Sequence, residues 1–180
     1  KGMWPMGAAD GGAEQTGRVE RERLVWVGPA AAAELPRSTR RIDGAGMYLM
    51  PGLAEMHGHI PPPNQPQAEI EKTLYLYLAN GITTVRGMLG YPGQLALREQ
   101  AKEGMIDAPT LYRAGPSFNG NSVSSPSQAA DKVRTQVEEG WDLLKIHPGM
   151  TRHEFDAMAE TAKANGIDFG GHVPADVGLE

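Results

Sequence analysis

From about residue 50 onward, short apolar runs alternate with longer stretches whose apolar residues recur at helical spacing. Ile70, Leu74 and Leu78 lie four residues apart, as residues on one face of a helix do. The run 82–86 is rich in β-branched residues, which favour strands. The pattern predicts strands over 109–114, 141–147 and 167–173, two more in 50–59 and 82–86, and helices that begin near residues 67, 93, 126 and 151.

Local signals mark the ends of two of these helices. Ser125 before Pro126 is a good N-cap, and Thr151 with Glu154 forms a capping box. Gly140 and Gly166 are expected to end the helices that begin there.

This alternation is typical of right-handed strand–helix–strand units, and it predicts a parallel sheet. A β/α barrel would explain the order of the elements. Before residue 48 the pattern differs, because a charged stretch at 18–23 is followed by the apolar run 24–27 and then by Gly28 and Pro29. We interpret this part as short β-strands joined by turns.

The composition narrows the choice of partners. The 180 residues carry a net charge of -5 and no cysteine, so thiolate ligands and disulfides are excluded, and both cytoplasm and periplasm stay open as compartments. The basic residues are scattered, which argues against nucleic-acid and anionic-membrane surfaces. No apolar run approaches the roughly 18 residues of a membrane span. We therefore expect a small molecule or a peptide as the partner.

His57 and His59 are the first candidate chemical groups. Residues i and i+2 of a strand point to the same face, so both imidazoles would aim at one spot, as metal ligands do. Two strand histidines with ordinary hydrogen bonds are the alternative. His57, His59, Lys145 and His172 all fall at or near the ends of predicted strands, where β/α barrels carry their reactive groups.

Several motifs together resemble the amidohydrolase superfamily of metal-dependent hydrolases, and they cover nearly the whole chain. The resemblance is closest to the branch of imidazolonepropionase-like and Xaa-Pro dipeptidase-like enzymes. Members combine a distorted eight-stranded barrel with a small β-sandwich. The motifs are Ile42-Asp43-Gly44, Met50-Pro51-Gly52-Leu53 with His57-x-His59, Gly81-Ile82-Thr83-Thr84-Val85-Arg86, Leu144-Lys145-Ile146, and Gly171-His172-Val173-Pro174.

The resemblance implies a set of metal ligands. His57 and His59 match the first-strand ligands of the more buried metal, Lys145 matches a fourth-strand lysine that is carboxylated to bridge two metals, and His172 matches the fifth-strand ligand. Only a neutral amine reacts with carbon dioxide, and burial beside cations favours that form of a lysine. The cofactor implied is a divalent metal, with zinc the expected ion, present as one or two ions that supply a hydroxide.

The chain also departs from the family pattern. The sixth-strand histidine and the eighth-strand aspartate, which handles the proton, have no counterpart, so no catalytic residue is assigned. Glu55 and Gly87 stand where aspartate is common. We expect an α/β fold: a partial (β/α)8 barrel of the TIM type with about five strands and four helices, after a small β-rich segment. Residues 1–48 would form part of a β-sandwich, and residues 49–180 a barrel truncated after its fifth strand.

Three further residues are candidates for binding substrate. His147 shares the strand of Lys145 but precedes Pro148, Asn119 lies in a polar loop after the third strand, and Arg86 could meet a substrate carboxylate. A supporting role beside the metal ligands is also open for His147, and an ion pair inside the barrel is the alternative for Arg86.

The predicted function is hydrolysis of carbon–nitrogen bonds in an amide, lactam or dipeptide-like substrate by a metal-activated hydroxide. The chain would be the N-terminal part of a longer enzyme and inactive alone. The alternative is a catalytically inactive truncated barrel, or an assembly module that needs a partner chain, because an open parallel sheet leaves an edge unpaired. A homo-oligomer is an open option.

Overall fold

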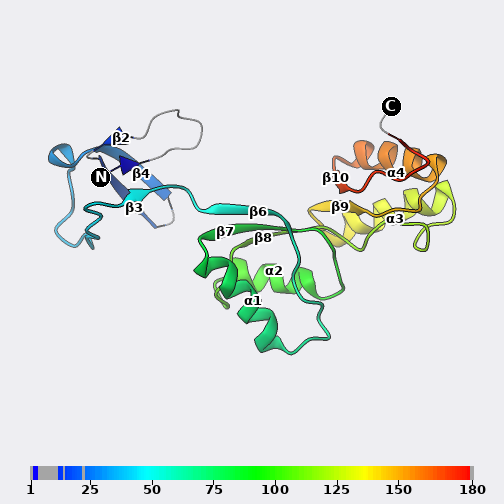
Figure 1. Cartoon of the computed structure of the whole chain (residues 1–180), viewed down its shortest axis with the longest axis horizontal. Helices are drawn as coiled ribbons and strands as arrows, with labels where there is room; N and C mark the ends of the chain where they lie inside the picture. The colour runs from blue at the N-terminus through cyan, green and yellow to red at the C-terminus, as the bar shows by residue number, and fades with distance from the viewer. Residues whose placement is uncertain (1, 4–11, 14, 22, 179–180) are drawn as a thin grey trace. The chain divides into compact units, whose positions relative to one another are not determined.

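The structure, a computed structural model, describes residues 2–3, 12–13, 15–21 and 23–178. The chain divides into two compact units, Lys1–Pro51 and Gly52–Glu180 (Figure 1). Each unit is built from its own sheets, and all the candidate site residues belong to the second unit.

The first unit consists of short strands, as predicted. Two of them, β3 (Gln15–Glu20) and β4 (Arg23–Pro29), pair antiparallel with a register shift at Arg18 and Val19, and a 3-10 turn, η1 (Ala30–Ala32), follows. A second sheet has the strand order β2-β1-β5. Its strands are β1 (Gly2–Met3), β2 (Gly12–Ala13) and β5 (Tyr48–Leu49). Their assignment to a β-sandwich stays a prediction.

The second unit alternates strands and helices, which confirms the predicted mixed α/β fold with parallel sheets. One parallel sheet has the order β6-β7-β8, and a second is the parallel pair β9 and β10. The strands are β6 (Leu53–Gly58), β7 (Ile82–Gly87), β8 (Thr110–Arg113), β9 (Leu143–Ile146) and β10 (Asp168–Gly171). The helices are α1 (Gln67–Ala79), α2 (Gln94–Lys102), α3 (Pro126–Glu139) and α4 (Arg152–Asn165).

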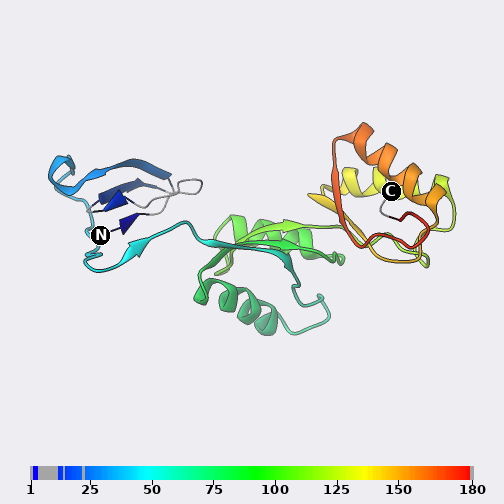
Figure 2. The same cartoon turned by 45° about the horizontal axis from the view of Figure 1, so that its top comes forward.

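Each sheet is covered by two helices on one face, and Figures 1 and 2 show α1 and α2 with the first sheet and α3 and α4 with the second. Val85 and Leu111 of the first sheet pack with residues of α1 and α2 in one apolar cluster. Leu144 and Ile146 of β9 pack with residues of α3 and α4 in another. Because neighbouring strand residues point to opposite faces, Arg86 and Lys145 face away from these helices.

The segment after β8 joins the two sheets. Ala114 and Phe118 form isolated parallel bridges to Leu143 and Ile146 of β9. Phe118 is fully buried, its backbone N–H donates to the Lys145 carbonyl at 2.8 Å, and its own carbonyl accepts from the His147 N–H at 2.8 Å. The chain therefore runs as an irregular strand between β8 and β9 and fixes their relative positions.

The helix ends follow local sequence signals. The Ser125 side chain accepts from the backbone of the first turn of α3, and Thr151 and Glu154 form a complete capping box on α4, both as predicted. The glycines Gly140 and Gly166 end these helices with left-handed φ values of 86° and 66°. No helix in the described part of the chain has the length and apolar character needed to cross a membrane.

Candidate metal centre

The His-x-His motif lies at the carboxyl end of β6. His57 is in the strand and His59 follows its last residue, with the two imidazole centroids 5.5 Å apart. Gly58 between them is buried, whereas both histidines are exposed. A Cβ added to Gly58 would lie 2.5 Å from Cγ1 of Val85, so this residue faces the helix-covered side. The two imidazoles are thereby directed to the open side of the sheet.

Backbone contacts hold this strand end in place. The His57 N–H donates to Oε1 of Glu55 at 2.8 Å, and the Tyr77 hydroxyl donates to the His59 carbonyl at 3.4 Å. Arg86 of β7 donates from Nε to the carbonyl of Met56 at 2.7 Å. Arg86 thus supports β6, and its predicted role toward a substrate carboxylate stays a prediction.

Lys145 of β9 brings its amine to the same place. Its side chain is fully buried, and Nζ lies 3.5 Å from Nε2 of His57, a residue 88 positions earlier in the chain. Burial lowers the pKa of the Lys145 amine, and the charge of Arg86 lowers it further. Both effects favour the neutral amine.

His172 and His147 complete the group. His172 directly follows β10 and donates its backbone N–H to the Ile146 carbonyl at 3.0 Å. Its ring centroid is 5.2 Å from that of His147, the residue that follows β9. Gly171 before it has a φ of 139°, and an added Cβ would collide with the Ile146 carbonyl, so glycine is required for His172 to reach this position.

Besides Lys145, two histidines of this group have lowered pKa values, which favour their neutral forms. Burial lowers the pKa of His57, and the charges of Lys145, His59, Arg86 and His172 lower it further in that order. The pKa of His147 is lowered first by burial and then by Lys145 and the neighbouring histidines. Neutral imidazole and neutral amine nitrogens are lone-pair donors, which is the form that binds metal ions.

Within the described residues, no group of three or more His, Cys, Asp or Glu side chains is arranged to hold a metal ion. The predicted ligand set differs from such a group because it includes Lys145. The contacts in the structure join Lys145 to His57, His57 to His59, and His172 to His147. The assignment of the four predicted ligands stays a prediction.

Asn119 uses its side chain within its own loop. Its Nδ2 donates to the Ser117 hydroxyl at 3.1 Å, and its Oδ1 accepts from the Asn121 N–H at 2.9 Å. The Ser122 hydroxyl accepts from the Asn119 N–H at 2.9 Å. These contacts shape the loop after β8, and the substrate-binding role proposed for Asn119 stays a prediction.

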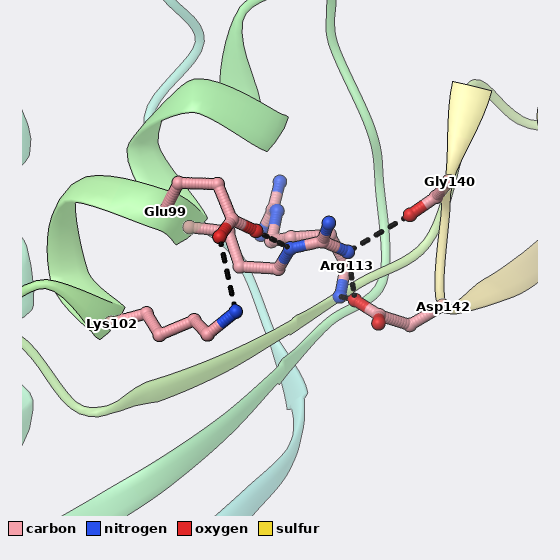
Figure 3. A network of polar contacts seen from close by, with 6 residues as sticks. Glu99, Lys102, Arg113, Gly140 and Asp142 are labelled. Atoms are coloured by element: carbon pink, nitrogen blue, oxygen red, sulfur yellow. Dashed lines mark hydrogen bonds and ion pairs between the residues drawn. The ribbon is translucent and has the colours of Figure 1, made fainter.

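The sequence patterns did not indicate the buried polar network behind the strand ends. Arg113, the last residue of β8, is fully buried and donates from Nη2 to the Leu89 carbonyl at 3.1 Å and to Oε1 of Gln94. Asp142 accepts from the Arg113 N–H at 2.7 Å and from Nη1 of Arg98 at 3.0 Å (Figure 3). One sequence signal could have predicted the burial of Arg113. It lies two residues after Leu111 in the same strand, so both side chains point to the helix-covered face.

Parallel strands that carry candidate reactive groups beyond their carboxyl ends are the arrangement of α/β enzymes, whose active sites lie at that edge. The parallel strands of the second unit have this arrangement, and comparison with known proteins shows what the chain is similar to.

No protein-family model matches the chain. An adenine deaminase of Rhizobium meliloti is 24% identical over 164 residues, which cover 83% of this chain and 27% of the relative. An imidazolonepropionase of an Arthrobacter species is 34% identical over 126 residues, which cover 67% of this chain and 31% of the relative. The chain thus spans about three tenths of the length of these curated relatives.

Solved structures show the same fold over more of the chain. A molinate hydrolase superposes with a TM-score of 0.80 at 17% identity, covering 96% of this chain and 52% of that protein. An Xaa-Pro dipeptidase with bound methionine gives a TM-score of 0.76 at 17% identity, covering 97% of this chain and 56% of that protein. Together, relatives and structures point to the amidohydrolase superfamily and leave the branch open.

Proposed function

We propose that this chain is the N-terminal part of a metal-dependent hydrolase that cleaves carbon–nitrogen bonds. The observation that carries the proposal is the buried amine of Lys145, 3.5 Å from Nε2 of His57. Strands that are far apart in the sequence converge there, at the edge where α/β enzymes act. The names deaminase and dipeptidase among the similar proteins denote reactions at carbon–nitrogen bonds.

The residues present suit a divalent metal such as zinc. Histidine nitrogen is a common zinc ligand. Although the His57 side chain is exposed, partial desolvation and the charge of Lys145 lower its pKa, which favours the neutral nitrogen that binds metal. In this proposal His57, His59, Lys145 and His172 hold one or two ions. A divalent metal at such a site supplies a hydroxide near neutral pH and polarises a carbonyl.

Lys145 contributes best as a carbamate. Its neutral amine attacks carbon dioxide, a nitrogen–carbon bond forms, and the proton leaves to solvent or to a neighbouring base. The product is a carbamate, an anion with two oxygens, and it replaces the protonated form of the amine beside the cation of Arg86. This change removes the repulsion between Lys145 and Arg86 that lowers the pKa of the amine.

His147 is our candidate for contact with the substrate, because its ring lies beside that of His172 at the open edge of β9. Arg86 and Asn119 are further candidates for binding a small-molecule or dipeptide-like substrate. Within the longer enzyme, the described strands would form the first part of a β/α barrel. The coverage of about half of the solved hydrolase and dipeptidase structures supports this proposal.

The test is the metal content of His57→Ala. The wild-type chain, loaded with zinc and dialysed, should retain the metal. The zinc affinity of the variant should fall at least about tenfold, because one of the proposed metal ligands has been removed. His153→Ala is the matched control, since His153 is an exposed histidine on α4. Equal zinc retention by the wild-type chain and His57→Ala would contradict the proposal.

A second candidate function is that of an inactive module that associates with another chain. It is favoured by the large exposed side chains on the strands of the first parallel sheet, where Leu53, Met56 and Tyr112 are 51%, 50% and 49% exposed. Where such side chains form a contiguous patch, the surface is typical of those that bind other proteins.

A further inference from the structure

Gln94, near the start of α2, is a buried side chain with hydrogen bonds to several segments. Its exposed fraction is only 2%. Nε2 donates to the carbonyls of Ile60 at 3.4 Å and Pro61 at 3.3 Å, while Oε1 accepts from the Tyr91 N–H at 3.0 Å and from Nη2 of Arg113. A buried amide that makes these contacts is held in one orientation.

The partners of Gln94 follow three consecutive strands. Ile60 and Pro61 come directly after His59 at the end of β6, Tyr91 lies in the loop after β7, and Arg113 ends β8. Ile60 is itself 4% exposed and packs in the cluster beneath the sheet. One side chain thus connects the segment after the His-x-His motif to the loop after β7 and to the last residue of β8.

Arg113 determines which way the amide of Gln94 points. A guanidinium can only donate hydrogen bonds, so the oxygen of Gln94 must face Arg113 and the NH2 group must face the Ile60 and Pro61 carbonyls. Nε and Nη1 of Arg113 have no hydrogen-bond partner, and the Asp142 carboxylate accepts from its backbone N–H. The Gln94 oxygen is therefore the side-chain acceptor that anchors this buried cation.

We propose that Gln94, oriented by Arg113, is a positioning residue for His59. It touches neither His59 nor the candidate metal position and acts through the two carbonyls that follow the motif. The inference rests on the proposed function for the metal-binding role of His59. Groups that orient ligands in this indirect way typically change metal affinity by about 10–100-fold when they are removed.

Gln94→Glu separates the hydrogen bond that Gln94 accepts from Arg113 from the two that it donates to Ile60 and Pro61. The carboxylate still accepts from Arg113, and with a charged acceptor this bond becomes stronger. It can no longer donate to Ile60 and Pro61, and its charge repels their carbonyl oxygens. We expect the unfolding temperature to stay close to wild type, while the affinity for Co²⁺ falls about tenfold.

The second measurement needs no metal. In the metal-free chain, the His59 imidazole resonances of Gln94→Glu should shift relative to wild type, because the segment after His59 is released. Gln100→Glu is the matched control, since it makes the same change on the same helix, and the hydrogen bonds to the Ile60 and Pro61 carbonyls come from Gln94. It should leave both the resonances and the Co²⁺ affinity unchanged.

The outcomes separate the possible roles of Gln94. Unchanged His59 resonances and unchanged Co²⁺ affinity in Gln94→Glu would overturn the proposal, even if stability fell. If the wild-type chain binds no Co²⁺ but the His59 resonances still shift, the positioning role holds and the proposed metal function fails. If Gln94→Glu does not fold, Arg113→Met replaces it: it removes a buried charge and the orientation of Gln94, and it should shift the same resonances.

Discussion

The candidate site contains three side chains whose pKa values the structure lowers, which favours their neutral forms. Burial is the largest cause of the lowered pKa of His57, Lys145 and His147. In the sequence, Lys145 lies between two apolar residues of a predicted strand, a pattern typical of a buried strand, and the structure buries its side chain. Its approach to His57 follows from the fold of the whole unit and not from the local pattern.

The lowered pKa values of His57 and His147 predict a loss of stability in acid. The unfolded chain takes up protons near the ordinary value of 6.5, and the folded chain does so only at lower pH. Between these values the unfolded state binds more protons, so stability falls as pH decreases below about 6.5. With a chelator present, the urea midpoint should be lower at about pH 5 than at about pH 7.5.

The double variant His57→Asn/His147→Asn should show a flatter decline of this midpoint, because the two groups responsible are gone. His153→Asn, at an exposed position on α4, is the control and should decline as the wild-type chain does. A wild-type pH profile in the double variant would show that other groups cause the acid loss.

Helices and strands differ in how well the sequence specifies their ends. The capping box at Thr151 and the glycine ends of α3 and α4 were predicted correctly, because these signals lie within a few residues of the helix end. β9 begins at Leu143 and not at Trp141 as predicted. The Trp141 N–H still donates to the carbonyl of Gln136 in the preceding helix at 3.1 Å, and the Asp142 N–H donates to the Arg113 carbonyl at 3.0 Å. Strand ends depend on distant partners, which the local pattern does not contain.

The capping box of α4 gives a prediction about stability. Thr151→Ala removes the hydroxyl that accepts from the Glu154 N–H and should lower the free energy of unfolding by about 1 kcal/mol. Thr161→Ala, in the same helix, loses only a bond to the carbonyl four residues earlier and should be neutral or slightly stabilising. Urea denaturation measures both, and equal losses would contradict a capping role.

In the second unit as a whole, Asp142 connects the end of β8, helix α2 and the start of β9. Its carboxylate accepts from the Arg113 N–H and from Arg98, and Figure 3 shows it in a network with Glu99 and Lys102. This connection was not predicted from the sequence, because its partners lie 29 and 44 residues away and no local pattern marks an aspartate before a strand as paired.

Asp142→Ala should therefore lower the free energy of unfolding by about 1–3 kcal/mol, since it leaves the Arg113 N–H without an acceptor. The matched control is Asp131→Ala, which breaks a pair whose side chains are 55% and 74% exposed and should cost less than about 0.5 kcal/mol. Similar losses in the two variants, measured by urea denaturation, would show that Asp142 does not join the two sheets.

The exposed apolar strand residues predict association of the isolated chain. Light scattering should show a mass above that of one chain that rises with concentration. Met56→Gln/Tyr112→Gln should reduce this association, whereas Tyr75→Gln, at a helical position that is 57% exposed, should not. A monomer at all concentrations would exclude the alternative of an assembly module.

Gly58 has a consequence for how the gene can vary. A Cβ at this position would meet Cγ1 of Val85 at 2.5 Å and Cγ of Glu55 at 3.2 Å, and a β-branched valine in a strand has little freedom to move aside. Every missense change of this codon should therefore be lost in a mutational scan that selects only for folded protein. His57 and His59 should be lost only when the scan selects for activity, so the three adjacent codons separate selection for folding from selection for function.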